Sequence, residues 1–233
     1  MFSFKKFSIK QDRAAMKVCT DSCLFAALVS VENKERVLDI GCGTGLLSLM
    51  LAQKNKNLRI TAIEINADAV LDASENIQDS PFRDRISLVH QSVQDFSKKS
   101  EEKFDLIVCN PPFYQNNLKS DKSSKNIARH ADELTFYDLA YCLKQLLTPD
   151  GSAWLLLPPF EMNSFLKLSS ENGFFPKRKY LVKHSENKPV FREIVELQRI
   201  KTEQVEISPI NIYENHQYSP IFVELLRDYY LIF

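Results

Sequence analysis

The residues that most clearly indicate chemistry are Asn110-Pro111-Pro112-Phe113, which follow the apolar run Phe104–Cys109. Proline fixes φ at about −65° and has no N–H group, so two consecutive prolines make a stiff loop. In such a loop, the side-chain oxygen of Asn110 and the carbonyl oxygen of Pro111 can each accept a hydrogen from one –NH₂ group. Phe113, helped by Tyr114, can stack on a planar substrate and hold it in line for displacement.

This arrangement suits the chemistry of an exocyclic amine. Such a nitrogen is a weak nucleophile because its lone pair is delocalised into the adjacent ring or carbonyl. Two acceptors favour the pyramidal geometry in which the lone pair points at an electrophile, and they stabilise the positive charge that develops on nitrogen. No strong base is needed, since the proton can leave after the transfer. Taken alone, the tetrapeptide fits an ordinary turn equally well; its place after a buried strand and a glycine loop favours the functional interpretation.

A glycine-rich loop precedes this segment, with Gly41, Gly43 and Gly45 between an apolar run and a helical one. Glycines let the backbone approach a ligand closely, and the helix N-terminus behind the loop presents unpaired N–H groups. Glu64 follows the next apolar run, where its carboxylate can accept hydrogen bonds from both hydroxyls of a ribose. A glycine loop with an acidic partner fits both NAD and S-adenosylmethionine, and a tight turn without a ligand is the structural alternative.

Two features favour S-adenosylmethionine over NAD. The spacing of the three glycines differs from the dinucleotide pattern G-x-G-x-x-G. Asp39 also precedes the loop, and a carboxylate repels a pyrophosphate but attracts an ammonium or sulfonium cation. The sequence therefore predicts a donor of methyl groups beside an acceptor site for a planar amine.

The elements that must hold these residues alternate along the chain. We expect strands at 36–40, 58–64, 85–90, 104–110 and 152–157, separated by helices at 46–53, 67–78 and 133–147. This alternation predicts an α/β fold with a mostly parallel sheet covered on both faces, in which ligands lie at the carboxyl ends of the strands. After Gly173, strands at 179–184 and 194–200 are expected to pair antiparallel at the sheet edge. Thr20-Asp21 is expected to cap a helix that runs to Ser30.

Composition limits the remaining possibilities. The chain has 233 residues, 44% hydrophobic and 26% charged, which is typical of one globular domain. No apolar run reaches the roughly 20 residues of a membrane span, and the first residues are not those of a secretion signal. The five cysteines have neither disulfide-framework nor metal-site spacing, although Cys19 and Cys23 could share a helix face. A cytoplasmic protein that binds no metal and no membrane is expected; the sequence does not fix the oligomeric state, and a monomer is the working expectation.

Basic residues form three local clusters although 30 basic and 30 acidic residues cancel. Each cluster is either solvated surface or a binding site for a polyanion such as RNA. The clusters are Lys5, Lys6, Lys10, Arg13 and Lys17; then Lys119, Lys122, Lys125, Arg129 and His130; and finally Lys177, Arg178, Lys179, Lys183 and His184.

With its glycine loop and its Asn110–Phe113 segment, the chain resembles class I S-adenosylmethionine-dependent methyltransferases of the N-P-P-[FY] type. The resemblance implies a Rossmann-like, seven-stranded sheet with an antiparallel edge strand. It also implies that Asp39, Gly41 and Gly43 contact the methionine part of the cofactor and that Glu64 binds the ribose. An acidic residue that the family often places near the adenine is replaced here by Ser92-Val93, which leaves a weaker or backbone contact. The expected cofactor contacts further include Ile65 and Asn110.

A narrower resemblance is to the bacterial tRNA1(Val) (adenine-N6)-methyltransferases, which modify the adenine immediately 3′ of the anticodon, at position 37. It is carried, besides Asn110–Phe113, by the segments 7–12, 15–18, 20–21, 128–130 and 225–230. The resemblance implies one domain over 1–233, in which residues 1–33 cover the cofactor and 34–233 form the core. Lys17 and Thr20 are then expected at the cofactor. A tRNA loop is expected to contact Lys10, Tyr114, Arg129, His130, Lys177 and Lys179.

Other functions stay open at this point. The same chemistry could serve guanine N2 of ribosomal RNA, adenine N6 of DNA or a glutamine side chain of a protein. The glutamine enzymes usually carry Tyr at the position of Phe113 and a separate N-terminal helical domain. An NAD-dependent enzyme and a non-catalytic RNA-binding module are alternatives of a different class.

Overall fold

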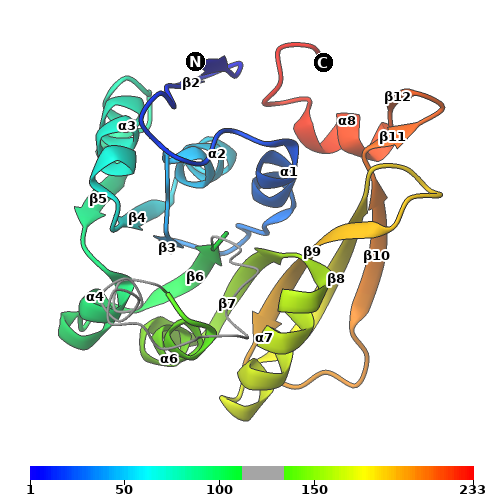
Figure 1. Ribbon diagram of the computed structural model, residues 1–233. Helices are drawn as coiled ribbons and strands as arrows, with labels where there is room; N and C mark the ends of the chain where they lie inside the picture. The colour runs from blue at the N-terminus through cyan, green and yellow to red at the C-terminus, as the bar shows by residue number, and fades with distance from the viewer. Residues whose placement is uncertain (112–133) are drawn as a thin grey trace, which may run out of the picture.

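A computed structural model describes residues 1–111 and 134–233. Its centre is an eight-stranded sheet with the order β10-β8-β9-β7-β6-β3-β4-β5 (Figure 1). The strands are β3 (Arg36–Ile40), β4 (Arg59–Glu64), β5 (Ile86–His90), β6 (Phe104–Cys109), β7 (Leu147–Leu157), β8 (Phe175–Lys183), β9 (Val190–Gln198) and β10 (Glu206–Asn211). Two short antiparallel pairs lie outside it: β1 (Phe2–Ser3) with β2 (Ser8–Ile9), and β11 (Tyr213–Glu214) with β12 (Gln217–Tyr218).

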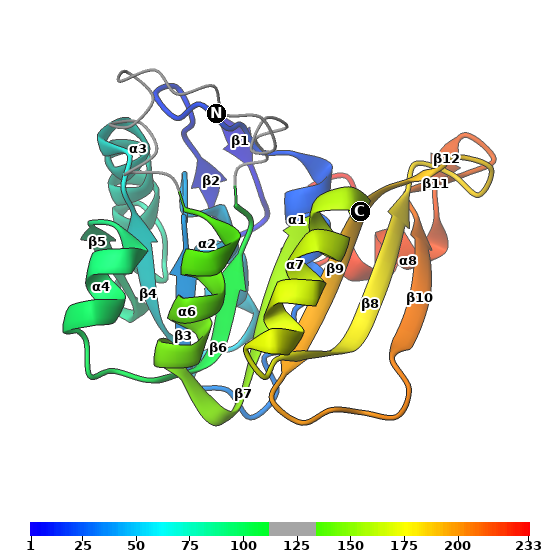
Figure 2. The same ribbon diagram turned by 60° about the horizontal axis from the view of Figure 1, so that its bottom comes forward.

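Helices cover both faces of the sheet (Figure 2). One face packs against α1 (Thr20–Leu28), α2 (Leu46–Lys54), α3 (Ala67–Gln78) and α8 (Pro220–Leu226). The other packs against α4 (Val93–Lys99), α6 (Phe136–Leu146) and α7 (Pro159–Glu171). Because helices bury both faces, the central strands are apolar throughout: every residue of β3 after Arg36 is buried. The predicted α/β class with a mostly parallel sheet is confirmed.

The sheet differs from the prediction at one side. It has eight strands instead of seven, and the antiparallel strand β9 lies between β7 and β8 instead of at the edge. β8 and β9 pair antiparallel as predicted, but β10 adds to β8 in parallel and becomes the outer strand. Which strand lies at the edge depends on β10, a later segment of the chain, so the local pattern of residues 179–200 could not predict it.

Several predicted boundaries also shift. The first residue of α1 is Thr20, so Cys19 occupies the N-cap position without a side-chain cap, and the predicted capping by Thr20-Asp21 is wrong. β7 begins at Leu147 instead of residue 152, and α6 ends at Leu146. α4, α7, α8 and β10 were not predicted.

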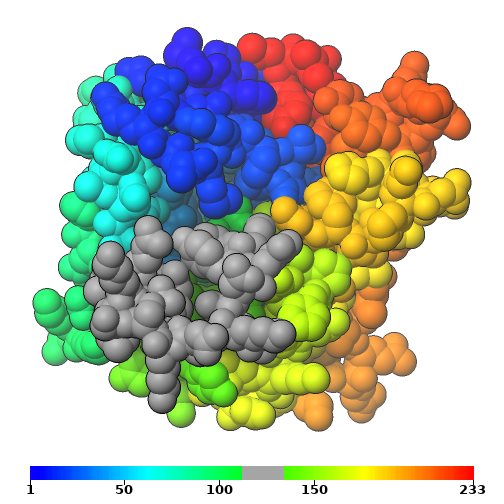
Figure 3. Space-filling model, viewed as in Figure 1, coloured from blue at the N-terminus to red at the C-terminus, as the bar shows by residue number. Residues whose placement is uncertain are grey.

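The two ends of the chain lie side by side (Figures 1 and 3). Phe4 forms an isolated antiparallel bridge with Tyr230, and the Lys5 ammonium donates to the carbonyl oxygen of Phe233 at 2.8 Å. The N-terminal segment then crosses α3 (cyan in Figure 3) before it enters α1. None of the helices in residues 1–111 and 134–233 is long and apolar enough to cross a membrane.

Candidate active site

The glycine loop leaves β3 at the carboxyl edge of the sheet and enters α2. Gly41, Gly43 and Gly45 have φ values of 69°, 57° and 81°, in the left-handed region that other residues rarely adopt. The N–H groups of Gly41 and Cys42 donate to the Ile63 carbonyl oxygen at 2.9 and 3.0 Å, which ties the loop to β4. A Cβ atom added at Gly41 or Gly43 would meet no atom of the described residues within 4 Å. The loop therefore has open space above it, as close approach of a ligand requires.

Glu64, at the end of β4, organises this loop from the side. Its Oε2 accepts the N–H of Gly43 at 2.9 Å, and its Oε1 accepts those of Ile65 and Asn66 at 2.9 and 2.8 Å. A carboxylate has about four acceptor positions, so the three N–H groups leave one for another donor. Glu64 thus has a structural role in the loop that the sequence did not reveal, and it retains capacity for one ribose hydroxyl in this arrangement.

Asp39 lies beneath the loop and is fully buried. Its Oδ2 accepts the N–H and the hydroxyl of Ser48 in α2, at 3.1 and 2.7 Å. Its Oδ1 is buried and has no hydrogen-bond partner among the described residues. Burial raises the pKa of this carboxyl group to about 7, although the bonds from Ser48 act in the opposite direction. A buried carboxyl oxygen without a partner beside an open glycine loop fits a cation.

Asn110 follows β6 at the same edge. The strand register pairs Ile40 with Cys109, so Asn110 and Gly41 are the next residues on neighbouring parallel strands. The Asn110 side-chain nitrogen donates to the Ser22 hydroxyl oxygen at 3.0 Å. Its side-chain oxygen is buried and has no partner within residues 1–111 and 134–233. The amide is therefore anchored by its nitrogen, and its oxygen has no partner in the described part of the chain. Pro111 behind it is buried.

Sequence reasoning missed Ser22, the residue that orients this amide. Ser22 belongs to the first turn of α1, and its hydroxyl lies 3.0 Å from the Cys19 sulfur. The preceding Asp21 is fixed by Arg192 of β9, whose Nε donates to Asp21 Oδ2 at 2.9 Å. α1 thereby joins Asn110 to β9, which lies two strands away from β6 in the sheet. A serine 88 positions upstream carries no local pattern that links it to Asn110.

The N-terminal segment is bound to α3 and to the glycine loop. Asn76 accepts the Lys10 N–H at 2.7 Å and donates to the carbonyl oxygens of Lys10 and Thr44 at 2.8 and 2.9 Å. Asp72 accepts the N–H groups of Arg13 and Ala14 at 3.0 and 2.8 Å. The segment thus lies beside the loop, as expected of a segment that covers a cofactor.

The basic side chains of this segment are engaged within the protein. Lys10 pairs with Glu75 and Asp79 at 3.3 and 2.9 Å, and these carboxylates raise its pKa. The Lys17 ammonium donates to the carbonyl oxygens of Gln11 and Ala14. Thr20 is half-buried at the first turn of α1, one residue after the N-cap.

The third predicted contact region follows β5. Ser92 caps α4 by accepting the Asp95 N–H at 3.1 Å, and Val93 is buried in the core. Ile65 is 43% exposed at the end of β4, so it is available for an apolar contact with a ligand. Sequence reasoning missed the capping role of Ser92 because it did not predict α4.

The structure does not bring Lys177 and Lys179 to the Asn110 loop. Lys177 lies near the start of β8 and Lys179 at its middle, whereas the carboxyl end of this strand is Lys183. Lys179 also pairs with the buried Glu193 at 2.8 Å. The predicted contacts of Pro112, Phe113, Tyr114, Arg129 and His130 lie outside the described residues.

Among the described residues, no group of three or more His, Cys, Asp or Glu side chains is arranged to hold a metal ion. The five cysteines are free thiols. Burial raises the pKa of Cys23 to about 12 and that of Cys109 well above its usual range, so both remain protonated near neutral pH.

Comparison with known proteins identifies the family. The family model of the methyltransferase small domain matches residues 14–136. A curated tRNA1(Val) (adenine(37)-N6)-methyltransferase of Dyadobacter fermentans is 44% identical over 100% of this chain and 98% of its own length. A protein of the same name from Cytophaga hutchinsonii is 39% identical over 99% and 97%.

Solved structures agree on the fold. A predicted O-methyltransferase of Agrobacterium tumefaciens superposes with a TM-score of 0.67 at 18% identity, over 89% of this chain and 96% of that one. The glycine loop, its acidic partner and the Asn110 segment lie where this fold places ligands. The chain belongs to the methyltransferase small domain family.

Proposed function

We propose that this protein transfers the methyl group of S-adenosylmethionine to N6 of adenine 37 in tRNA1(Val). The names of the relatives that match end to end support this substrate. The observation that carries the chemistry is the Asn110 amide, whose nitrogen is held by Ser22 while its buried oxygen has no partner among the described residues.

The residues at the carboxyl edge fit the cofactor. Gly41 and Gly43 offer open space for close approach, and Asp39 offers a buried acceptor to a positively charged group. The remaining acceptor position of Glu64 suits a ribose hydroxyl. Ile65 directly follows β4, and Ser92 and Val93 stand at the start of α4 just after β5; these three residues are the proposed contacts of the adenine. When bound, S-adenosylmethionine supplies an electrophilic methyl group.

Asn110 acts on the other reactant. Its side-chain oxygen accepts one N6 hydrogen, and the Pro111 carbonyl oxygen accepts the second. These two acceptors turn the lone pair of N6 out of conjugation with the ring and stabilise the positive charge that develops on nitrogen. The proton leaves after the transfer, so no residue has to act as a strong base. Phe113 stacks on the adenine in this proposal.

The adenine must leave its stack in the anticodon loop to reach Asn110. Unstacking costs a few kcal/mol, and less in a loop than in a duplex. Because Lys10 is paired with Glu75 and Asp79, its predicted contact with RNA requires exchange of an ion pair. The Lys17 ammonium likewise has to exchange its hydrogen bonds to contact the cofactor, as predicted for it. Arg129, His130 and Tyr114 complete the proposed substrate contacts. We further propose that the protein acts in the cytoplasm, where tRNA is found.

The experiment that tests this function uses tRNA from cells that lack the protein. The purified protein and labelled S-adenosylmethionine should modify tRNA1(Val) at adenine 37, and nucleoside analysis should identify N6-methyladenosine. Methylation of ribosomal RNA, DNA or a protein glutamine instead of tRNA would assign one of the rival substrates. Absence of any transfer together with binding of RNA would favour a non-catalytic module.

A further inference from the structure

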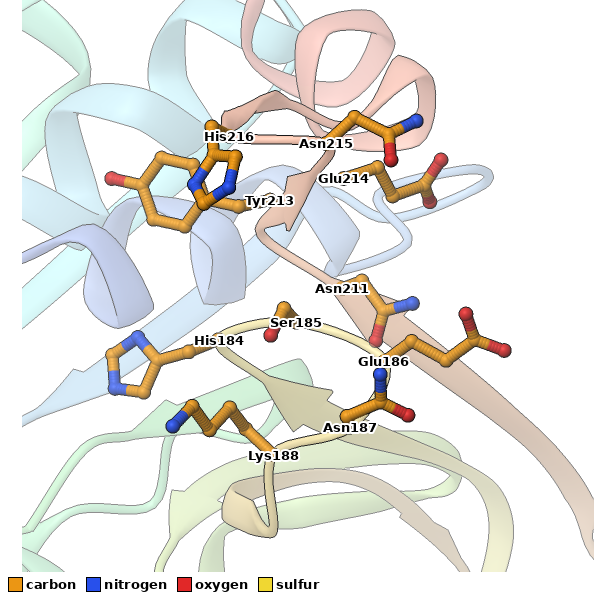
Figure 4. A pocket seen from close by; sticks show the side chains of 10 residues that line it. All are labelled: His184, Ser185, Glu186, Asn187, Lys188, Asn211, Tyr213, Glu214, Asn215 and His216. Atoms are coloured by element: carbon orange, nitrogen blue, oxygen red, sulfur yellow. The ribbon is translucent and has the colours of Figure 1, made fainter.

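Two hairpins at the β8–β10 side of the sheet border an open, polar pocket of about 830 Å³ (Figure 4). One is the turn between β8 and β9, which carries His184, Asn187 and Lys188. The other is the β11–β12 hairpin, which carries Tyr213 and His216. The volume is within the range of about 300–1,000 Å³ that is usual for pockets that bind small molecules or single chemical groups. Of the proposed catalytic and cofactor-binding residues that the structure describes, none lines this pocket.

The pocket lies at the same edge of the sheet as Asn110. β8 and β10 run in the same direction as β6, so Lys183 and Asn211 end at the edge where Asn110 begins its loop. The order β6-β7-β9-β8-β10 separates them by three to four strand spacings of about 4.8 Å each, which gives about 15–20 Å along the edge. About five stacked RNA nucleotides span this distance at 3.4 Å each, and fewer nucleotides suffice if the RNA is extended.

Aromatic rings in the pocket are held ready for stacking. His184 lies on Phe191 with ring centroids 4.2 Å apart and an interplanar angle of 7°. Tyr213 is the exposed end of a column in which it stacks on Tyr218, and Tyr218 on the buried Phe222, with centroids 5.0 and 4.9 Å apart. Rings that are fixed from behind lose little conformational freedom when a flat partner stacks on them.

Hydrogen-bonding groups between the hairpins suit the edge of a base. Asn211 lines the pocket, and its side-chain oxygen is buried without a partner in the described parts of the chain. Asn187 and Asn215 add two more amides, which can each donate and accept. Unpaired bases in RNA are recognised by this combination of stacking and amide contacts.

The charges of the pocket disfavour the phosphate backbone as its ligand. Lys188 is the only lysine or arginine that lines the described pocket, while Glu186 and Glu214 contribute two carboxylates. One ammonium and two carboxylates give the lining no excess of positive charge with which to attract phosphate.

We propose that this pocket binds an unpaired base of the RNA substrate, a few nucleotides from the adenine at Asn110, and so sets the register of the loop. This inference rests on the proposed function. It adds a contact on the side of the protein where Lys177 and Lys179 were predicted to bind RNA.

The test compares RNA binding and methylation for the double variant His184→Ala/Asn187→Ala. Asn57→Ala, an exposed asparagine at the opposite edge of the sheet, is the matched control. Binding of an anticodon stem-loop is measured by anisotropy in the presence of S-adenosylhomocysteine, and methylation is measured at saturating S-adenosylmethionine. The double variant should bind the RNA about tenfold more weakly, as expected for the loss of one base stack, with kcat unchanged. The slope of affinity against salt should stay the same, because no phosphate contact is lost.

A series of stem-loops with one abasic nucleotide locates the base. One abasic position should weaken binding to the unaltered protein but not to the double variant. The proposal that this pocket binds a base is refuted if every abasic position weakens binding equally in both proteins, or if the double variant binds as tightly as Asn57→Ala. In either case, methylation of the stem-loop by the unaltered protein would leave the proposed function intact. An unaltered protein that neither binds nor methylates the stem-loop would overturn both.

Discussion

The hydrogen bond to Ser22 orients the side-chain amide of Asn110, so loss of the Ser22 hydroxyl should slow methyl transfer. In Ser22→Ala the Asn110 side-chain nitrogen loses its 3.0 Å acceptor in a part-buried position. An unpaired buried donor costs about 1–3 kcal/mol, so the amide turns or shifts, and its oxygen no longer faces the substrate in every molecule. We expect kcat to fall about tenfold, which corresponds to about 1.4 kcal/mol of activation free energy.

The assay separates orientation from binding and from stability. Single-turnover methylation gives the rate of the chemical step, and calorimetry gives the affinity for S-adenosylmethionine, which should change little because Ser22 does not belong to the glycine loop. Ser22→Thr keeps a hydroxyl and should recover most of the rate. Ser169→Ala in α7 is the matched control, since Ser169 is also buried and its hydroxyl bonds the carbonyl oxygens of Leu166 and Phe174, away from the proposed site.

A double-mutant cycle with Asn110→Ala completes the test. If Ser22 acts through Asn110, Ser22→Ala should slow the reaction of the Asn110→Ala protein no further. The reasoning is refuted if Ser22→Ala lowers the rate no more than Ser169→Ala does, or if the two effects multiply.

Three other changes test the rest of the site. Asn110→Ala should reduce kcat at least a hundredfold, the scale for losing one fixed group that stabilises developing charge, while the affinity for S-adenosylmethionine measured by calorimetry stays within a few-fold. Gly43→Ala places a side chain at a φ of 57° above the loop, so urea unfolding should show a loss of about 1–2 kcal/mol, and cofactor affinity should fall as well. Asp39 is buried and its pKa is raised to about 7, so between about pH 4 and pH 7 the folded protein holds a proton that the unfolded chain has released. Stability should therefore decrease as pH rises through this window, by up to about 1.4 kcal/mol per pH unit, and unfolding of Asp39→Asn at pH 5 and pH 7.5 should show a flatter decrease.

The sequence determined the elements that depend on local periodicity. β3 and α3 have the predicted bounds, and α2 and β4 differ by one residue, because apolar alternation and flanking turn residues act over a few positions. The motifs also predicted that Asn110, Gly41 and Glu64 share one edge of the sheet, since a parallel sheet places the carboxyl ends of its strands together. The structure places these three residues at that edge.

Other features depended on parts of the chain that are distant in sequence. The edge strand β10 pairs with β8, and no pattern within 206–211 specifies that partner. The raised pKa of Asp39 also depends on distant packing, because it arises from burial of this side chain beside α2.

The sequence by itself determined the chemistry, methyl transfer, because a carboxylate, a glycine loop and a rigid asparagine at strand ends can be recognised as motifs. Only the tertiary structure decided which side chains hold those groups in place and which basic side chains are already engaged in ion pairs within the protein. Ser22 reaches Asn110 across 88 positions, and Lys179 is paired with Glu193. The physical reason is that hydrogen bonds and ion pairs form wherever folding brings donors and acceptors together, and the separation of two residues along the chain does not encode that proximity.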